Sequence, residues 1–184
     1  MFRFFRMSFY RKDGSGTETL SEVEIARAGA ADSLLTQFKS VPGEDAGNID
    51  IVALQSWITE VRKLAALAKR SAIADTYIGQ ILAHSPPESG VWPPTPVCSV
   101  LEDLSSAEIE SGLRNKRFNM CGTMIKAMFE GGDQERRLAK DHRKWSEARR
   151  EYPRTASLLG KIAGEWDQEA KRHRSEEHTS ELQS

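Results

Sequence analysis

The sequence has few cysteines, on which disulfide-rich extracellular proteins depend, and no long apolar run, on which membrane proteins depend. Only two cysteines occur in 184 residues, Cys98 and Cys121, with no CxxC spacing. A disulfide framework is therefore not predicted, and two buried free thiols are expected instead. No apolar run approaches the roughly 20 residues needed to cross a bilayer. The 26 basic and 27 acidic residues leave a net charge of −1, so no overall field favours nucleic acid or a membrane surface.

The motifs of common enzymes are missing as well. The sequence contains no P-loop, no GxGxxG and no GxSxG. Its histidines, His84, His142, His173 and His178, have no partner at metal-ligand spacing, and His142 is expected on a solvated helix face. We predict no catalytic residue, no cofactor, no metal and no small-molecule ligand in this chain; the parent protein's activity stays open.

What the sequence does contain is helical periodicity broken by proline and glycine. Apolar residues at i, i+3 and i+4 predict helices over 21–40, 51–70, 72–83, 95–104, 107–116, 133–151 and 154–173. The stretch HSPPESGVWPP, 84–94, predicts a rigid loop in which Trp92 fills a gap in the core. Residues 117–132 fit either a helix or a packed loop. The fold class predicted is all-α, an irregular helical bundle or a short helical solenoid, with a domain over 20–173.

Polar residues mark where these helices begin. Capping boxes are predicted at Ser21 with Glu24 and at Ser105 with Glu108. Single caps are predicted at Asp50, Thr95 and Asp133.

The N-terminus MFRFFRMSFYRK crowds aromatic and basic residues together. Phe2, Phe5 and Phe9 share one helical face. Residues 1–11 are predicted to be the last helix of a preceding region, with this face as an interaction surface; the alternative is the end of this region's own core. The stretch lacks an apolar h-region and a cleavage site, so it is not predicted to be a signal peptide, and a cytoplasmic bacterial protein is expected.

The C-terminus RSEEHTSELQS, 174–184, is unlike the rest of the chain. Back-translated, it resembles the adapter oligonucleotide of short-read sequencing libraries. That resemblance implies a non-native tail on a metagenomic fragment, and a real polar tail is the alternative. The tail holds one arginine and three glutamates, so the remaining chain carries about one positive charge.

Several stretches together resemble the C-terminal region of long uncharacterised bacterial proteins. They include IDIVALQSWITEVRKLA, GGDQERRLA and YPRTASLLGKIAGEWDQEA. The Trp92-Pro93 pair before a short helix fits this family, whereas its Y-N-S-R-G turn is matched only by Phe118, Asn119 and Gly122. The resemblance spans roughly 41–173. It implies that the chain is the tail of a longer protein, and it brings no activity with it.

Two functions from different classes follow. A hydrophobic content of 39% gives a thin core, which favours a non-catalytic helical interaction or scaffold module whose partners are other domains of the parent chain. The alternative is nucleic-acid binding by the basic helix over 136–154. Its contacts would be four cations, with one aromatic ring as a stacking surface: Arg136, Lys140, Arg143, Lys144 and Trp145. A solvated helix with pairs such as Arg143 to Glu147 explains the same charges.

Overall fold

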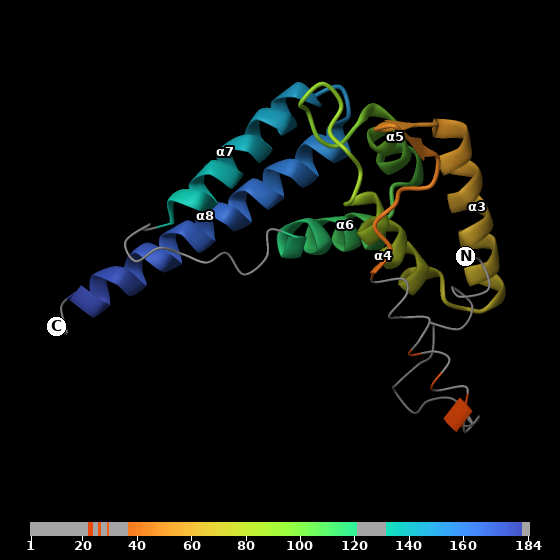
Figure 1. Ribbon diagram of the computed structural model, residues 1–184, viewed down its shortest axis with the longest axis horizontal. Coiled ribbons are helices and arrows are strands. Elements are labelled where there is room, and N and C mark those ends of the chain that lie inside the picture. Colours follow the sequence, from red (N-terminus) through yellow and green to blue (C-terminus); the bar gives the residue numbers. More distant parts are fainter. Residues whose placement is uncertain (1–21, 24–25, 27–28, 30–36, 121–131, 182–184) are drawn as a thin grey trace. The chain divides into compact units, whose positions relative to one another are not determined.

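The computed structural model describes residues 22–23, 26, 29, 37–120 and 132–181, with side chains as far as Arg172. The chain divides into two compact units, which are described separately. The first comprises Met1–Pro86 and Ser106–Arg117, and the second comprises Pro87–Ser105 and Phe118–Ser184. The fold is all-α, as predicted, because the two strands within the described residues span only two residues each (Figure 1).

The first unit begins, in its continuously described part, with a small hairpin and a long helix. Strands β1 (Glu44–Asp45) and β2 (Asn48–Ile49) pair antiparallel, with Glu44 opposite Ile49. Helix α3 (Ile51–Leu67) follows, and its N-cap is Asp50, as predicted. The Asp50 carboxylate accepts hydrogen bonds from the amides of Val52 and Ala53 at 2.8 and 3.3 Å. The predicted apolar stripe of α3 faces the core, where Leu54, Trp57, Ile58, Val61 and Ala65 are buried.

Helix α4 (Ser71–Leu82) crosses the first turns of α6 (Ala107–Met120) at two glycines. A Cβ on Gly79 would lie 2.0 Å from the carbonyl oxygen of Ile109, and one on Gly112 would lie 2.1 Å from that of Thr76. Only glycine leaves room for two helix backbones to approach this closely. The crossing buries Ile78, Ile109 and Leu113 almost completely.

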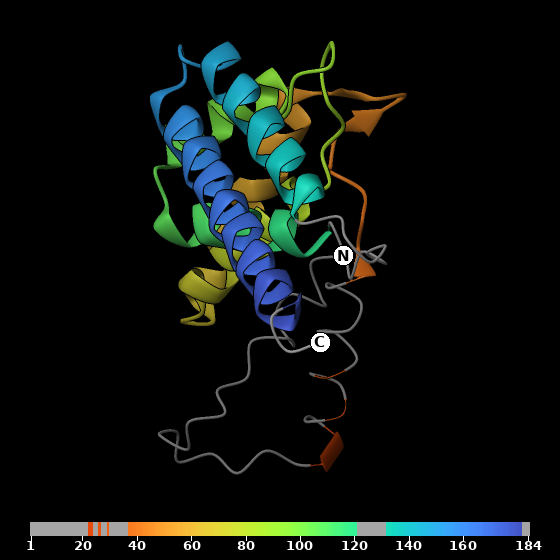
Figure 2. The same ribbon diagram turned by 90° about the vertical axis from the view of Figure 1, so that its left-hand side faces the viewer.

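The second unit contains α5 (Thr95–Leu104), α7 (Asp133–Ala148) and α8 (Pro153–Glu181). Helices α7 and α8 lie side by side and run antiparallel, as both views show (Figures 1 and 2). Helix α5 contacts α8. The core of the unit comes mostly from α5 and α8, with Trp92 from the loop before α5; it includes Val97, Leu101, Leu159, Ile162 and Trp166.

Three of the predicted N-caps are one residue away from the N-caps observed. Ser106, not Ser105, accepts the hydrogen bond from the Ile109 amide at 3.3 Å, because Ser105 has φ +49° and already ends α5. Pro94 precedes α5 and Gly132 precedes α7, so Thr95 and Asp133 are the first helical residues.

Four predicted segments differ in length from the helices observed. Helices α3 and α7 each end three residues before the predicted ends at 70 and 151. Helix α6 extends through Met120, beyond the predicted end at 116. Helix α8 continues to Glu181, into the tail that was predicted to be non-native. The predictions for Phe2, Phe5 and Phe9, for the Ser21–Glu24 box and for 121–131 lie outside the described residues.

Candidate functional site

The loop before α5 makes a tight turn in the second unit. Glu88 and Val91 exchange two backbone hydrogen bonds of 2.9 Å each. Between them, Ser89 and Gly90 both have positive φ, +50° and +80°. This is the backbone of a two-residue hairpin turn, and it places the Gly90 carbonyl where a side chain of α7 can reach it.

Arg149, just after α7, fastens this loop. It is 8% exposed. Its Nε donates to the Pro93 carbonyl at 3.0 Å, and its two terminal nitrogens donate to the Thr95 hydroxyl at 3.3 Å and the Glu88 carboxylate at 3.0 Å. The rigid guanidinium fork suits such divergent acceptors. Arg149 therefore holds the loop from a buried position, although it falls within the basic helix predicted over 136–154, whose charges a solvated helix would also explain.

Glu88 is the acidic partner in this network. Thr95 donates to the same carboxylate oxygen through its hydroxyl at 2.5 Å and through its amide at 2.9 Å. These bonds, chiefly the one from the Thr95 hydroxyl, hold the pKa of the Glu88 carboxyl below its usual value. Glu88 thus carries a negative charge beside Arg149 at neutral pH, as a structural ion pair requires.

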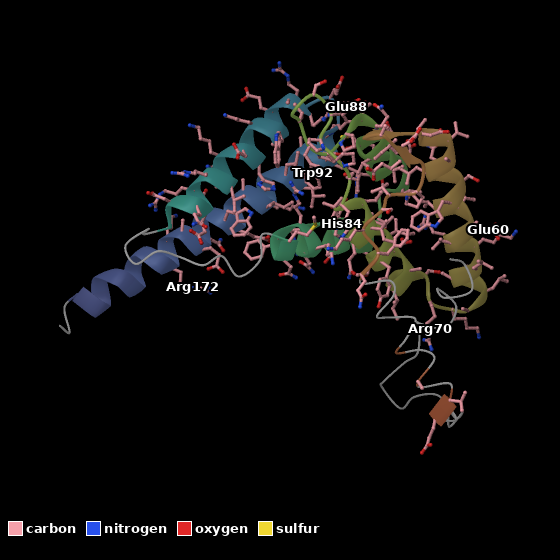
Figure 3. The ribbon with its side chains drawn as sticks, viewed as in Figure 1. Glu60, Arg70, His84, Glu88, Trp92 and Arg172 are labelled. Carbon is pink, nitrogen blue, oxygen red and sulfur yellow. The ribbon has the colours of Figure 1, made fainter. Side chains whose placement is uncertain are left out.

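Trp92, His142 and Trp145 form an aromatic cluster under the loop. The His142 ring lies 4.9 Å from Trp145 and 6.3 Å from Trp92, centroid to centroid, both edge to face. The Trp145 indole N–H donates to the Gly90 carbonyl at 3.0 Å. Figure 3 shows Glu88 and Trp92 near the end at which α7 and α8 are joined, with Arg172 far from it. Trp92 is 1% exposed, which agrees with its predicted role in the core.

The expectation that His142 lies on a solvated face is wrong. His142 is 1% exposed, and its Nδ1 lies 2.8 Å from the Leu138 carbonyl oxygen. A carbonyl only accepts, so Nδ1 carries the proton of that hydrogen bond. Its position, seven residues before Arg149 and three before Trp145, places it on the inner face of α7. The wrong expectation came from the charged residues that flank His142 in the sequence.

Cys98 lies in the same unit but is not a reactive thiol. It is buried, and its Sγ lies 3.5 Å from the Pro93 carbonyl. Burial raises the pKa of the Cys98 thiol to about 11. Since the thiolate is the nucleophile, Cys98 fills space rather than attacking a substrate.

Glu102 of α5 caps the start of α8. Its carboxylate accepts hydrogen bonds from the amides of Arg154 and Thr155 at 3.2 and 2.9 Å, and from the Thr155 hydroxyl at 3.1 Å. A carboxylate at a helix N-terminus also interacts favourably with the helix dipole. The cap comes from another helix, so no local sequence signal revealed it.

Asp75 plays a comparable part in the first unit. It is 4% exposed and pairs with Arg62 of α3, with Nε to Oδ1 at 3.0 Å. The Ser106 hydroxyl donates to its other oxygen at 2.7 Å. One buried carboxylate thus connects α3, α4 and the N-cap of α6.

The residues predicted to contact nucleic acid fall into two groups. Arg136 pairs with Asp133 at 2.5 Å, Arg143 pairs with Asp167 of α8, and Trp145 is occupied by Gly90 and the aromatic cluster. Lys140 and Lys144 are exposed and form no ion pair with a described residue. The pair Arg143 to Glu147 proposed from spacing is not what is observed, because Asp167 across the helix pair takes its place.

Helix α7 also exposes a cation that had not been included among these contacts. Arg137 is exposed and lies three residues before Lys140 and seven before Lys144. This spacing puts the three on one face of the helix. We call Arg137, Lys140 and Lys144 the cationic stripe.

Among the residues described, no group of three or more histidine, cysteine, aspartate or glutamate side chains is arranged to hold a metal ion. Within the same residues, no helix has both the length and the apolar character needed to span a membrane.

No family model matches the sequence, and no curated protein or solved structure is similar enough to be matched.

Proposed function

We propose that this chain is a non-catalytic helical interaction module of a larger bacterial protein. One observation carries the proposal: three charged side chains, the buried Arg149 and Asp75 and the half-buried Glu102, bind within their own unit. Arg149 holds a loop, Glu102 caps α8, and Asp75 joins α3 to α4 and α6. A general acid or base must lie within hydrogen-bond reach of a substrate proton, whereas these three groups are already bound to structural partners.

The exposed surface of the second unit supports an interaction role. Helix α7 is fixed against α8 through its inner face, where Ala139 and His142 are buried, and its outer face carries the cationic stripe. A helix held this way presents its side chains with a preset spacing, and preorganisation reduces the entropy lost on binding. The partners proposed are other domains of the parent chain or separate proteins.

We propose that the protein is cytoplasmic, which stays a prediction from the sequence. Cys98 is a buried free thiol, and free thiols persist in reducing compartments.

Nucleic-acid binding remains the second candidate. The exposure of Lys140 and Lys144 favours it, but two of the predicted arginines are already paired and the predicted stacking ring is occupied. It is tested directly by binding to a labelled duplex and a labelled single strand at low salt and at about 0.2 M, since phosphate contacts weaken steeply with salt.

Site-specific photo-crosslinking of the purified chain, added to an extract of bacterial cells, tests the interaction module. A photoreactive residue replaces, one at a time, Leu67 on α3, Lys144 on α7 or Gly160 on α8, all of which are exposed. We expect one discrete adduct from at least one of these positions, and excess unlabelled chain should compete it away. Urea-denatured chain is the control and should give none. Absence of any adduct from all three helices contradicts the proposal.

A further inference from the structure

The outer face of α7 carries some charged side chains that form ion pairs and others that form none with a described residue. Arg136 and Arg143 are held by Asp133 and Asp167. Lys140 and Lys144 of the cationic stripe have no ion-pair partner among the described residues, and Arg137 is exposed beside them. Exposed charges that a unit leaves unpaired on a fixed helix are available to a partner.

We infer that the cationic stripe is a docking surface for an acidic helical segment of a partner protein. This inference rests on the proposed interaction function and names the chemistry of its partner. Lys140 and Lys144 are one helical turn apart, a rise of about 6 Å. Glutamates at i and i+4 on a second helix have the same spacing, so two carboxylates of that helix meet two ammonium groups of this one.

The stripe suits an acidic protein better than nucleic acid for two reasons. Asp141 lies within it, one turn after Arg137 and nearly one turn before Lys144. A phosphate backbone carries only negative charge and is repelled there, whereas a partner helix can place a lysine opposite Asp141. Trp145, the ring predicted to stack on the bases of single-stranded nucleic acid, is also held by its bond to the Gly90 carbonyl.

The expected affinity is modest. Exposed ion pairs each contribute little because water and salt screen them. Three such contacts give binding that is weak, fast and strongly dependent on ionic strength. That behaviour fits a contact that accompanies another contact to the same partner protein, because linkage between two contacts raises the effective concentration.

Fluorescence anisotropy on the purified full chain tests this inference. The probe is a fluorescein-labelled helical peptide with glutamates at i and i+4 spacing, and a labelled DNA duplex is the competing probe. We expect saturable peptide binding at about 20 mM salt that weakens at least tenfold by about 0.2 M salt, as screening requires. Lys140→Glu with Lys144→Glu should weaken peptide binding at least tenfold.

A charge-matched control separates the stripe from a general charge effect. Lys39→Glu with Lys161→Glu changes two exposed lysines outside α7 by the same charge, and peptide binding should change less than about twofold. Circular dichroism must show both double variants folded. Equal loss in both variants, no saturable peptide binding, or tighter duplex binding through Lys140 and Lys144 overturns the inference. If the peptide fails while crosslinks still form from α3 or α8, the interaction module stands and only the α7 surface is wrong.

Discussion

Replacing Gly79 by alanine should destabilise the protein, although alanine is the better helix former. Gly79 lies in the middle of α4, where its Cα faces the backbone of α6. An added Cβ would lie 2.0 Å from the Ile109 carbonyl oxygen and 2.7 Å from the Leu113 amide nitrogen. Both atoms belong to a helix backbone, so neither can rotate away as a side chain does.

The magnitude follows from two opposing effects. Ordinary contacts of a Cβ begin at 3.4 Å, so the two helices must separate by more than about 1 Å, which opens gaps around Ile78 and Leu113. Overpacking of this kind costs about 1–3 kcal/mol, and the rigid neighbour places Gly79 toward the upper end. The helix preference of alanine over glycine returns about 0.5–1 kcal/mol. The free energy of unfolding should therefore fall by about 2 kcal/mol, and Tm should fall by about 4–8 °C.

Thermal and urea denaturation followed by circular dichroism measure this change. Gly160→Ala is the matched control, because a Cβ on that residue of α8 meets nothing within 4 Å. It should raise stability by about 0.5–1 kcal/mol. Gly112→Ala, at the other side of the crossing, should resemble Gly79→Ala. If Gly79→Ala is as stable as the wild-type chain, or is stabilised like the control, the α4–α6 backbones are not in close contact.

Other predictions concern caps, thiols, protonation and the tail. Glu102→Ala should lower the free energy of unfolding by about 1–2 kcal/mol, because the first turn of α8 loses its acceptors; an unchanged urea midpoint would refute the cap. In a Cys121→Ser chain, Cys98 should react with Ellman's reagent at pH 7.5 only after urea is added, since burial raises its pKa to about 11; fast labelling of the folded chain would contradict this. Burial lowers the pKa of His84 most, and the charges of nearby lysines and an arginine lower it further. As the pH falls below about 6.5, His84 therefore takes up a proton in the unfolded chain before it does so in the folded one. Stability should therefore drop between pH 7.5 and 5.5, and His84→Asn should reduce that drop; an equal drop in the variant would exclude His84 as its source. Deleting Arg174–Ser184 should leave Tm unchanged within about 1 °C, because ordering such a polar segment costs more than its burial returns, and a loss of several degrees would show that the tail packs on the protein.

The positions of the helices could be predicted because helical signals are local. In α3, apolar residues at i, i+3 and i+4 fixed the inner face, and Asp50 marked its start. Proline in the stretch over 84–94 excluded a helix there in the same local way. The N-cap of α6 was predicted one residue too early, at Ser105 instead of Ser106. The two serines are adjacent, and which of them caps α6 depends on how α5 ends.

The candidate surface on α7 was predictable only in part. Sequence showed that the helix is basic, and Lys140 and Lys144 are indeed exposed. It did not show which cations are already neutralised, because Asp167 meets Arg143 only when α8 packs against α7. Arg137 differs from Arg143, because its spacing from Lys140 and Lys144 already places it on their face of the helix.

By itself, then, the sequence determined the secondary structure and the all-α class, through periodicity, capping residues and prolines that act within a few positions of the chain. Only the tertiary structure decided which polar residues are buried and which are exposed. His142 and Arg149 lie within a sequence that reads as a solvated basic helix, yet both are buried. The loop over 87–95 brings Arg149 carbonyl and carboxylate oxygens from more than 50 residues away, and it places the Trp92 ring against His142. Burial of a charged or polar group depends on partners supplied by distant segments, and no local pattern encodes where those partners will lie.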